Sequence, residues 1–434
     1  MASFSIPLTG LEADSTALNT IANDLSNMNT TAFKAQTTNF SDLFYQQIGE
    51  TGSGDPIQVG AGVKVASNST DFSQGSYNTS GTTTSDMAID GNGFFILDDG
   101  GRNIYTRNGA FSQDTNGNLV TTSGLSVMGY PAPGGVVNTN APLAAISIPL
   151  TGQVQQPTAS TTFNMTANLD SEANSPFPAT VPVFDSLGAQ HNVTVAFTQT
   201  SPDSWTYSAA LPASDYSVAG GNVVPAALTG TLTFNQNGDL VQVQPTGQAL
   251  PSTVGTAAGD VQSIAFNFNP AANNVLADGA AGLNLQWNLL GSAGLPTISQ
   301  TDEASALSGV NSNGNAAGTC TGFTIGSDGT VTAQYTSGTE VVGQVALANM
   351  TNLQGLQLLG DGNYATTLAS GTATVGVTGS GGLGTIQDSA LEASNVNISS
   401  EFSDLIVAQR AFEANAKSVT TFDQVTEDTI NMVH

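Results

Sequence analysis

Two apolar helical patterns stand at opposite ends of this chain of 434 residues, while the sequence between them has almost no helical spacing. Near the start, Leu11, Leu18 and Leu25 recur every seven residues, with Ile21 and Met28 beside the last two. An isolated apolar seam of this kind needs a partner to cover it, so we expect each terminal helix to pack on the other and on neighbouring copies. Near the end, apolar residues step by threes and fours, close to the roughly 3.5-residue spacing of a coiled-coil seam: Ile398, Phe402, Leu405, Ala408, Phe412, Ala416, Val419 and Phe422.

The expected lengths of these helices favour a subunit of an assembly. The first helix is predicted over residues 5–28 and the second over residues 394–433, about 36 Å and about 60 Å long at 1.5 Å per residue. The alternative is an ordinary amphipathic helix packed on its own β-domain. Both patterns are much longer than the roughly 11 to 12 residues of an average globular helix, which argues against that alternative.

The middle of the chain is typical of β-structure. Residues 57–130 contain short alternating apolar runs separated by hairpin-type turns at 90–93 and 116–117, which predict a compact antiparallel β-domain. Residues 150–318 alternate in the same way, for example at Val193, Val195 and Phe197, and predict a second β-domain. The apolar cluster at residues 33–48 is compatible with either a second short helix or an extended connector.

The fold class that follows is mainly β with long terminal α-helices. We expect two antiparallel β-domains in a chain that goes out and comes back, with the N- and C-terminal helices paired as a coiled-coil-like bundle. The predicted domains are a terminal helical domain (1–29 with 392–434), a connector (30–75), an inner β-domain (76–149 with 319–391) and an inserted outer β-domain (150–318).

The charge of the chain excludes several classes of partner. Only 9% of the residues are charged, the formal net charge is −27, and no Lys or Arg lies between Arg107 and Arg410. Such a chain repels phosphate, which argues against nucleic acid and anionic membranes as partners. No run reaches the roughly 18 to 20 apolar residues of a membrane span, so we expect no membrane insertion. The acidic skew indicates either an ordinary acidic surface or one exposed to trypsin-like proteases, for which this stretch offers no cleavage site.

The chain has few of the residues from which catalytic and metal-binding sites are usually built. His191 and His434 are the only histidines, so no His-based triad or multi-His metal site can form. Cys320 is the single cysteine, which rules out an intrachain disulfide and a thiolate metal site. Neighbouring carboxylates such as Asp98 and Asp99 are better explained as exposed turn residues. We therefore predict no enzyme, no cofactor and no metal.

Three acidic turns resemble fragments of calcium-binding loops. They begin at Asp90, Asp114 and Asp361, but none completes a twelve-residue loop with a closing Glu. Whether they bind calcium stays open at this stage.

The start of the chain lacks a basic n-region and a long apolar run, so we expect no Sec-type signal peptide. A lone cysteine suits synthesis in a reducing cytoplasm. The long stretch without Lys or Arg instead suits a surface exposed to proteases. These indications of cytoplasmic synthesis and of an exposed location agree if the chain is exported by a route other than Sec.

Specific motifs resemble those of the bacterial flagellar rod and hook proteins. The segments that carry the resemblance are 21–34 near the start, 71–75, 87–95 and 105–112 in the first β-region, and 391–396 and 408–416 near the end. Ala32 stands where relatives commonly have glycine. The matching motif residues are Asn23, Asn27, Asn29, Thr30, Thr31, Phe33, Lys34, Asp90, Gly91, Gly93, Phe94, Gln409, Arg410 and Asn415.

Within that family, the insert of about 170 residues is similar to that of the hook members, because rod subunits are much shorter in the middle. The segments 183–188 and 343–349 carry this likeness. The resemblance implies a subunit that polymerises into a curved, flexible tube and transmits torque from rod to filament as a universal joint. The alternatives are a distal rod subunit or, from another class, a secreted adhesin.

The resemblance also implies partners and a location. The partners would be further copies of the chain, the rod, the hook cap, the hook–filament junction proteins and the export apparatus. The chain would be made in the cytoplasm, leave through the flagellar type III channel without a cleaved signal peptide, and end in the extracellular flagellum at the hook and basal body. We expect the polymerisation seam to comprise Leu11, Leu18, Ile21, Leu25, Met28, Ile398, Phe402, Leu405, Phe412, Val419 and Phe422.

Overall fold

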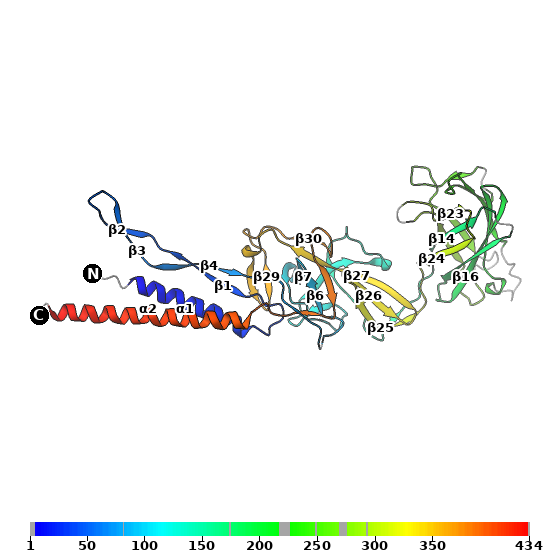
Figure 1. Cartoon of the computed structure of the whole chain (residues 1–434). Coiled ribbons are helices and arrows are strands. Elements are labelled where there is room, and N and C mark those ends of the chain that lie inside the picture. The colour runs from blue at the N-terminus through cyan, green and yellow to red at the C-terminus, as the bar shows by residue number, and fades with distance from the viewer. Residues whose placement is uncertain are drawn as a thin grey trace. The chain divides into compact units, whose positions relative to one another are not determined.

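The architecture comes from a computed structural model that describes residues 5–80, 82–172, 175–216, 226–247, 250–268, 276–291 and 294–432 (Figure 1). The chain divides into two compact units. Unit 1 contains Met1–Leu150, Phe323–Ala333 and Glu340–His434, and unit 2 contains Thr151–Gly322 and Gln334–Thr339. The predicted fold class is confirmed, because the chain is mostly strand with one long helix near each end.

The helices of unit 1 are α1 (Ser5–Ser26) and α2 (Ile398–Met432). Two asparagines explain where they end and begin. Asn27 folds back on the last turn of α1, where its Nδ2 donates to the Asn23 carbonyl at 2.9 Å. Asn397 caps the start of α2, because its Oδ1 accepts from the Ser399 amide at 3.1 Å. Across the described residues, we find no helix that combines the length and apolarity of a membrane span.

The connector is a long, irregular β-hairpin and not a second helix. At the base of the hairpin, β1 (Gln36–Asp42) and β4 (Val63–Thr70) pair antiparallel, with an irregularity between Asn39 and Phe40. At its tip, β2 (Tyr45–Glu50) and β3 (Pro56–Gly60) also pair antiparallel. β-Branched and aromatic residues are frequent in this segment and favour extended backbone over helix.

The β-domain of unit 1 is built around β7 (Phe94–Asp99), which is buried on both faces. Phe95 and Leu97 join one apolar cluster, whereas Phe94 and Ile96 join another. Around it lie β5 (Tyr77–Asn78), β6 (Met87–Asp90), β8 (Arg102–Thr106), β9 (Phe111–Gln113), β10 (Leu119–Thr121), β11 (Ser126–Pro131), the 3₁₀ turn η1 (Pro133–Gly135), β12 (Ala144–Ala145), η3 (Leu353–Gly355), β28 (Gln357–Gly360), β29 (Asn363–Ala365), β30 (Thr374–Val377), β31 (Thr385–Asp388) and β32 (Leu391–Glu392).

The out-and-back path of the chain is visible in the strand pairing. β6 pairs with β31, and β5 pairs with β32, so segments about 300 residues apart in sequence lie side by side. Three further strands, β25 (Gly318–Ile325), β26 (Thr330–Tyr335) and β27 (Gly338–Asn349), contribute residues to both units.

Unit 2 consists of two sheets over one core. The first is an antiparallel meander of β15 (Phe177–Phe184), β16 (Gln190–Ser201), β17 (Ser204–Ala210), β18 (Leu228–Phe234), β19 (Leu240–Pro245) and β20 (Ser252–Thr253). The second contains β14 (Thr162–Asp170), β21 (Ser263–Phe268), β22 (Leu283–Asn288), β23 (Ile298–Thr301) and β24 (Ala306–Ser312). The short β13 (Val154–Gln155) pairs with β25, and the 3₁₀ turn η2 (Ala213–Asp215) follows β17.

One detail corrects the expectation of purely antiparallel sheets. β14 pairs in parallel with both β22 and β23, because the chain crosses to the other sheet and returns before it forms them. Inward-facing side chains from both sheets alternate with outward-facing polar ones, and Trp205 and Trp287 are fully buried between them.

Candidate polymerisation surface

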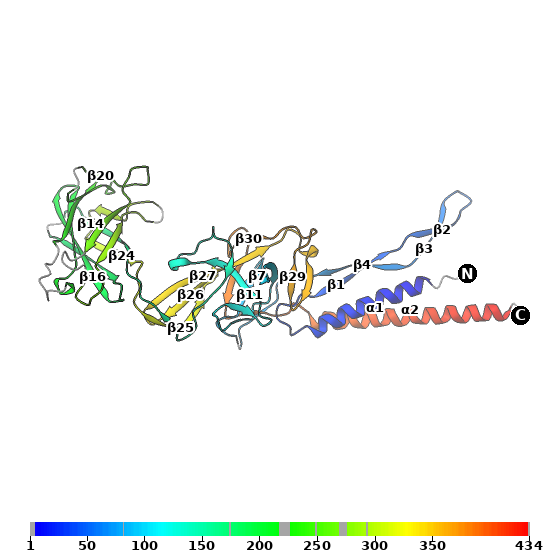
Figure 2. The same ribbon diagram turned by 180° about the vertical axis from the view of Figure 1, so that it is seen from behind.

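α1 and α2 lie side by side (Figures 1 and 2). The residues that this arrangement buries most are small. Gly10 and Ala13 are buried in α1, and Ala408 is buried in α2. A Cβ atom on Gly10 would come within 2.6 Å of the Asn415 side chain, so a larger residue at this position would displace Asn415. Asn415 Nδ2 donates to Asp14 Oδ2 at 2.8 Å across the pair.

The large apolar residues of the predicted seam keep exposed surface in the single chain. All of them are described, and none of them is buried. Phe402 is 53% exposed and Ile398 45%, with Met28 and Phe412 close to 40%. The remaining members are half-buried: Leu11, Leu18, Ile21, Leu25, Leu405, Val419 and Phe422. The seam residues therefore keep apolar surface that one copy of the chain does not cover, whereas the small residues Gly10, Ala13 and Ala408 are buried.

α2 carries further exposed apolar side chains that the periodicity analysis missed. They are Ile406, Val407, Val425, Ile430 and Met432, which are 52–80% exposed. They lie outside the predicted seam, whose members are three or four residues apart. A search for one seam therefore overlooks them. A helix that is apolar on several sides is normally buried on several sides. Within one chain, α1 covers only one side of α2.

The tip of the hairpin is a second exposed apolar surface of unit 1. Phe44 is 74% exposed and Ile48 63%, and Tyr45, Ile57 and Val59 are also exposed on β2, β3 and the preceding loop. Contiguous exposed apolar residues of this kind mark interaction surfaces in soluble proteins.

A groove of about 410 Å³ lies between α1, β1 and α2. Its apolar lining includes Ile21, Phe40 and Val407, and its rim carries Asp14, Glu401 and Asp404. The groove joins the half-buried side of the predicted seam to the hairpin. Unit 1 thus presents helix, groove and hairpin as one partly apolar region.

A buried ion-pair network holds the bases of both helices to the β-domain of unit 1. Lys34 Nζ donates to Glu392 Oε1 at 2.6 Å, and Arg107 Nε donates to Glu392 Oε2 at 3.0 Å. All three side chains are nearly inaccessible to solvent, and burial lowers the pKa of Lys34. Further bonds complete the network, from Lys34 to the Ser73 carbonyl at 2.7 Å and from the Gly75 amide to Glu392 at 2.9 Å.

α1 is also tied to β1 through buried polar groups. Asp24 Oδ2 accepts from the Gln36 amide at 2.8 Å, and Thr38 donates to Thr20 at 3.0 Å. Burial raises the pKa of Asp24, whose other carboxylate oxygen has no partner among the described residues. These contacts hold the C-terminal half of α1 against β1 of the hairpin.

The structure gives most of the motif residues local structural roles. Arg107 Nη1 donates to the carbonyls of Gly91 and Gly93 at 2.7 and 2.9 Å, which secures the turn before Phe94. Arg410 is exposed and pairs with Glu413 at 3.1 Å. Lys34 belongs to the buried network, whereas Gln409 points to solvent.

Sequence reasoning missed Glu392 as the hub of that network. A signal was available, because a chain with six Lys and Arg residues places two of them, Lys34 and Arg107, inside recognised motifs. When a chain with few cations places two of them inside family motifs, buried ion pairs are a reasonable expectation, and Glu392 lies in the matching motif near the other end.

One of the three acidic turns, at Asp114, uses its carboxylate internally. Asp114 Oδ1 accepts from the amides of Asn116 and Asn118 at 2.8 and 2.7 Å, and its Oδ2 accepts from the Asn118 side chain. This is the ordinary hydrogen bonding of an Asx turn. It explains the Asp-x-Asn-Gly pattern at this turn without an ion.

Comparison with known proteins agrees with the arrangement of the chain. Three family models match: Flagellar hook protein FlgE/F/G D1 domain over residues 88–164, Flagellar basal body protein FlaE D2 domain over residues 149–315, and Flagellar basal body rod FlgEFG protein C-terminal over residues 387–432. The flagellar hook protein FlgE of Salmonella typhimurium is 35% identical over 451 residues, covering 99% of this chain and 100% of that protein.

Two further relatives show the same end-to-end likeness. FlgE of Escherichia coli K12 is 34% identical over 449 residues, covering 99% of both chains. FlgE of Treponema pallidum is 30% identical over 458 residues, covering 98% of both chains. On this end-to-end similarity, the chain belongs to the flagellar hook protein FlgE family.

Proposed function

We propose that this chain is a structural subunit of the bacterial flagellar hook and that it polymerises with copies of itself. The observation that carries the proposal is the 35% identity to a flagellar hook protein over 99% of this chain. The family is structural, and the chain is accordingly not an enzyme. Its place is the hook of the flagellum.

The surface proposed for polymerisation is the region of α1, α2 and the hairpin. The predicted seam residues, from Leu11 to Met28 and from Ile398 to Phe422, would contact neighbouring copies. Their exposure in the single chain supports this assignment, as does that of Val407 and Phe44. A contact between different patches on successive copies does not close on itself, so it generates a helical tube.

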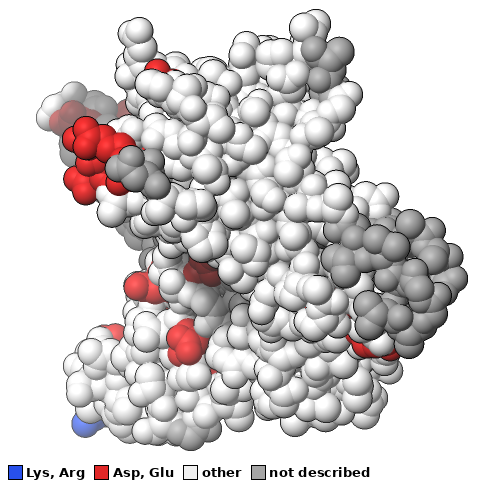
Figure 3. Space-filling view, turned by 90° about the vertical axis from the view of Figure 1, so that its right-hand side faces the viewer, with Lys and Arg blue, Asp and Glu red and all other residues white. Residues whose placement is uncertain are grey.

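The proposed division of labour follows the domains expected from the sequence. Residues 1–29 with 392–434 would form the polymer core, 30–75 the connector, 76–149 with 319–391 an inner β-domain and 150–318 an outer one. Outside the grey atoms, the face in Figure 3 is mostly uncharged, with scattered Asp and Glu and hardly any Lys or Arg. Few ion pairs between subunits leave few contacts that lock one register, which suits a tube that bends while it transmits torque as a universal joint.

The finer partners are part of the same proposal. They are the rod, the hook cap, the hook–filament junction proteins and the flagellar type III export apparatus. Export would occur from the cytoplasm without removal of a signal peptide.

Electron microscopy of the purified full chain under assembly conditions tests this function. We expect curved tubes, more readily formed as salt rises, because salt screens the repulsion between subunits of charge −27. Straight, stiff polymers would instead favour a distal rod subunit. A chain that never polymerises but binds a surface ligand would favour an adhesin and contradict the proposal.

A further inference from the structure

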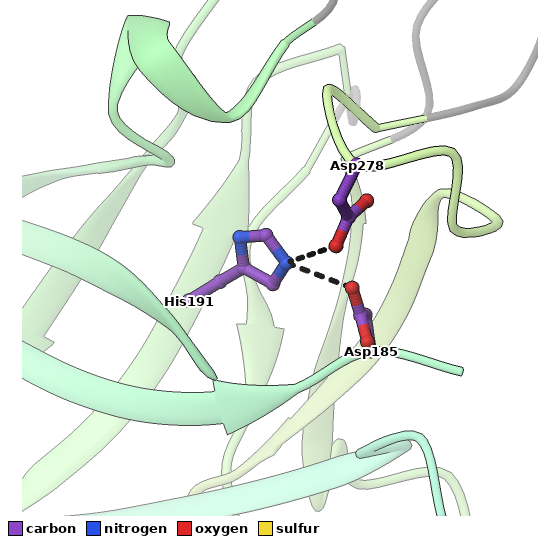
Figure 4. Close-up of side chains that lie close together, drawn as sticks. All are labelled: Asp185, His191 and Asp278. Carbon is purple, nitrogen blue, oxygen red and sulfur yellow. Dashed lines mark hydrogen bonds and ion pairs between the residues drawn. The ribbon is translucent and has the colours of Figure 1, made fainter. Parts of the chain in front are cut away.

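Unit 2 contains one side chain that can carry positive charge, and three carboxylates surround it. The sequence of this unit has Asp and Glu residues but no Lys or Arg, and His191 is its only histidine. His191 lies on β16. Asp215 ends η2. Asp185 follows β15, and Asp278 lies in a turn in which the Leu276 amide donates to the Ala280 carbonyl at 2.7 Å. Figure 4 shows Asp185 and Asp278 beside His191.

The two ring nitrogens of His191 have separate partners. Nδ1 lies 2.9 Å from Asp215 Oδ2, whereas Nε2 lies 3.1 Å from Asp185 Oδ2 and 3.8 Å from Asp278 Oδ2. Figure 4 shows Asp185 and Asp278 converging on the same nitrogen. Nε2 and the two carboxylate oxygens lie within 4.8 Å of one another.

Both carboxylates are held in place by their own turns. Asp185 Oδ1 accepts from the amides of Leu187 and Ala189 at 2.8 and 2.9 Å. Asp278 Oδ1 accepts from the Ala280 amide at 3.0 Å. Because each turn occupies one oxygen, the remaining Oδ2 atoms are fixed where they face Nε2.

Two carboxylate oxygens that face one ring nitrogen favour a positive charge beside them, which either a second proton on the imidazole or a bound cation supplies. When Asp215 accepts a hydrogen bond from Nδ1–H, the neutral ring presents its Nε2 lone pair to two carboxylate oxygens. No Lys or Arg in this unit can compensate them. A histidine whose far nitrogen donates to a carboxylate is the usual arrangement of a metal-binding imidazole, because the carboxylate fixes the tautomer and the ring orientation.

We propose that His191 Nε2, Asp185 Oδ2 and Asp278 Oδ2 bind one divalent transition-metal ion of the Zn²⁺ class. Tetrahedral ligands about 2.1 Å from such an ion are about 3.4 Å apart, a value that lies between the 3.1 and 3.8 Å separations of these atoms. An imidazole nitrogen favours Zn²⁺ over Mg²⁺ and Ca²⁺, which prefer all-oxygen shells with six or more ligands.

The site is buried on one side and open on the other. The Asp185 side chain is fully buried and that of His191 is 9% exposed, whereas that of Asp278 is 32% exposed. The open side leaves a fourth position for water. Asp215 is a positioning residue, because it touches the ring and not the ion. The ion would link the β15–β16 turn to the 276–280 turn and so stabilise unit 2.

Titration calorimetry with ZnCl₂ on the full chain, freed of metal by EDTA, tests the proposal. We expect one ion per chain and a rise in the melting temperature of unit 2, followed by tryptophan fluorescence. D278N should weaken binding at least tenfold, and D215N roughly 10- to 100-fold. The matched control is D239N, which removes one charge from another turn of unit 2, where Asp239 accepts from the Asn235 side chain at 3.1 Å. It should leave Zn²⁺ binding unchanged.

Nitrogen correlation spectra of the histidine rings separate coordination from a structural effect. On Zn²⁺ addition, Nε2 of His191 should shift to a metal-bound position while Nδ1 keeps its proton, and D215N should scramble the tautomer. Mg²⁺ and Ca²⁺ should leave the spectrum unchanged.

Two results would overturn the site. One is Zn²⁺ binding that D278N leaves as tight as in the parent chain. The other is a His191 ring that stays doubly protonated in saturating Zn²⁺ at neutral pH. The second result would show that the cluster holds protons and no metal.

Discussion

Large apolar side chains are mostly exposed on α2 but buried in unit 2. In the described part of α2, which spans 35 residues, Ala408 alone is buried, and large residues such as Phe402 and Val407 face solvent. In unit 2, alternating strands place Phe197, Trp205 and Trp287 in one closed core. The difference teaches which part of the chain is complete by itself. Unit 2 buries its large apolar side chains in its own core, whereas α1 and α2 leave large apolar side chains exposed in the single chain, as the proposed polymer contact needs.

The two tryptophans allow this comparison to be tested in one molecule. Trp205 and Trp287 are the only tryptophans of the chain, and both lie in the core of unit 2. Tryptophan fluorescence therefore follows unit 2, while far-UV circular dichroism at helical wavelengths also follows α1 and α2.

The largest expected effect is the loss of polymerisation in F402D. A carboxylate on an exposed apolar face cannot be buried against a neighbouring copy without a large desolvation cost. We expect no tubes by electron microscopy, with monomer unfolding unchanged within about 0.5 kcal/mol because the residue is exposed. The control is S403D at the adjacent exposed position. If F402D assembles as well as S403D, the assignment of the seam is wrong.

A second large effect is expected in unit 1 when the hub of the buried network is removed. E392A leaves Lys34 and Arg107 buried without their carboxylate, which should lower the free energy of unfolding of unit 1 by about 3–5 kcal/mol. Urea unfolding should show this loss by circular dichroism and leave the tryptophan transition unchanged. E427A, an exposed position on α2, is the control. A shift of both transitions would show that the two units unfold together.

A third variant destabilises unit 2 and leaves unit 1 unchanged. L285A removes a core side chain that is 1% exposed and should lower the stability of unit 2 by about 2–5 kcal/mol. The tryptophan transition should move, while tubes still form at temperatures where the variant is folded. L295A, at a position 68% exposed, should change neither property. Failure of folded L285A to assemble would show that unit 2 has a part in the polymer contacts.

The sequence predicted the terminal helices and the β-rich middle because both depend on local periodicity and turn residues. It could not predict that the α1–α2 contact uses Gly10, Ala13 and Ala408, because the choice between faces of a helix depends on its neighbours in space. The heptad leucines are the strongest periodic signal, yet they stay partly exposed in the single chain.

The long-range polar sites were equally hidden. Lys34 and Glu392 meet because the backbone before Lys34 bonds to the segment around Glu392, from the Ala32 amide to the Glu392 carbonyl at 2.8 Å, and no local sequence pattern records this contact. The group of Asp185, His191 and Asp278 has no ligand spacing in the sequence. The expectation of no metal considered thiolate and multi-His sites, and a site with one histidine and two distant carboxylates falls outside that search.

A smaller effect should appear as a pH dependence of the helix pair. Burial raises the pKa of Asp24, and burial together with the neighbouring Asp24 and Asp404 raises that of Glu401. Because both folded-state pKa values lie above those of the unfolded chain, the folded pair binds protons more tightly. The stability of the α1–α2 pair should therefore increase as pH falls from neutral through the folded pKa values.

Amide exchange in α1 measures this directly, and the gain should be complete below the unfolded values of 3.8 and 4.5. D24N should flatten the dependence. Exchange in α1 that speeds up on mild acidification would contradict the sign.

The smallest effect concerns the turn between α1 and β1, where Ala32 has a φ of 55°. This left-handed conformation strains a residue with a Cβ atom by about 1–2 kcal/mol, and glycine relieves the strain. Glycine also adds about 0.4–1 kcal/mol of unfolded-state entropy, so A32G should stabilise unit 1 by about 0.5–1 kcal/mol net. The Ala32 amide would keep its bond to the Glu392 carbonyl at 2.8 Å.

A13G is the matched control, because the same change inside α1 should destabilise the helix by about 1 kcal/mol. Tryptophan fluorescence should report neither change, since Ala32 and Ala13 both belong to unit 1. If A32G destabilises the chain, this turn is not strained by its alanine.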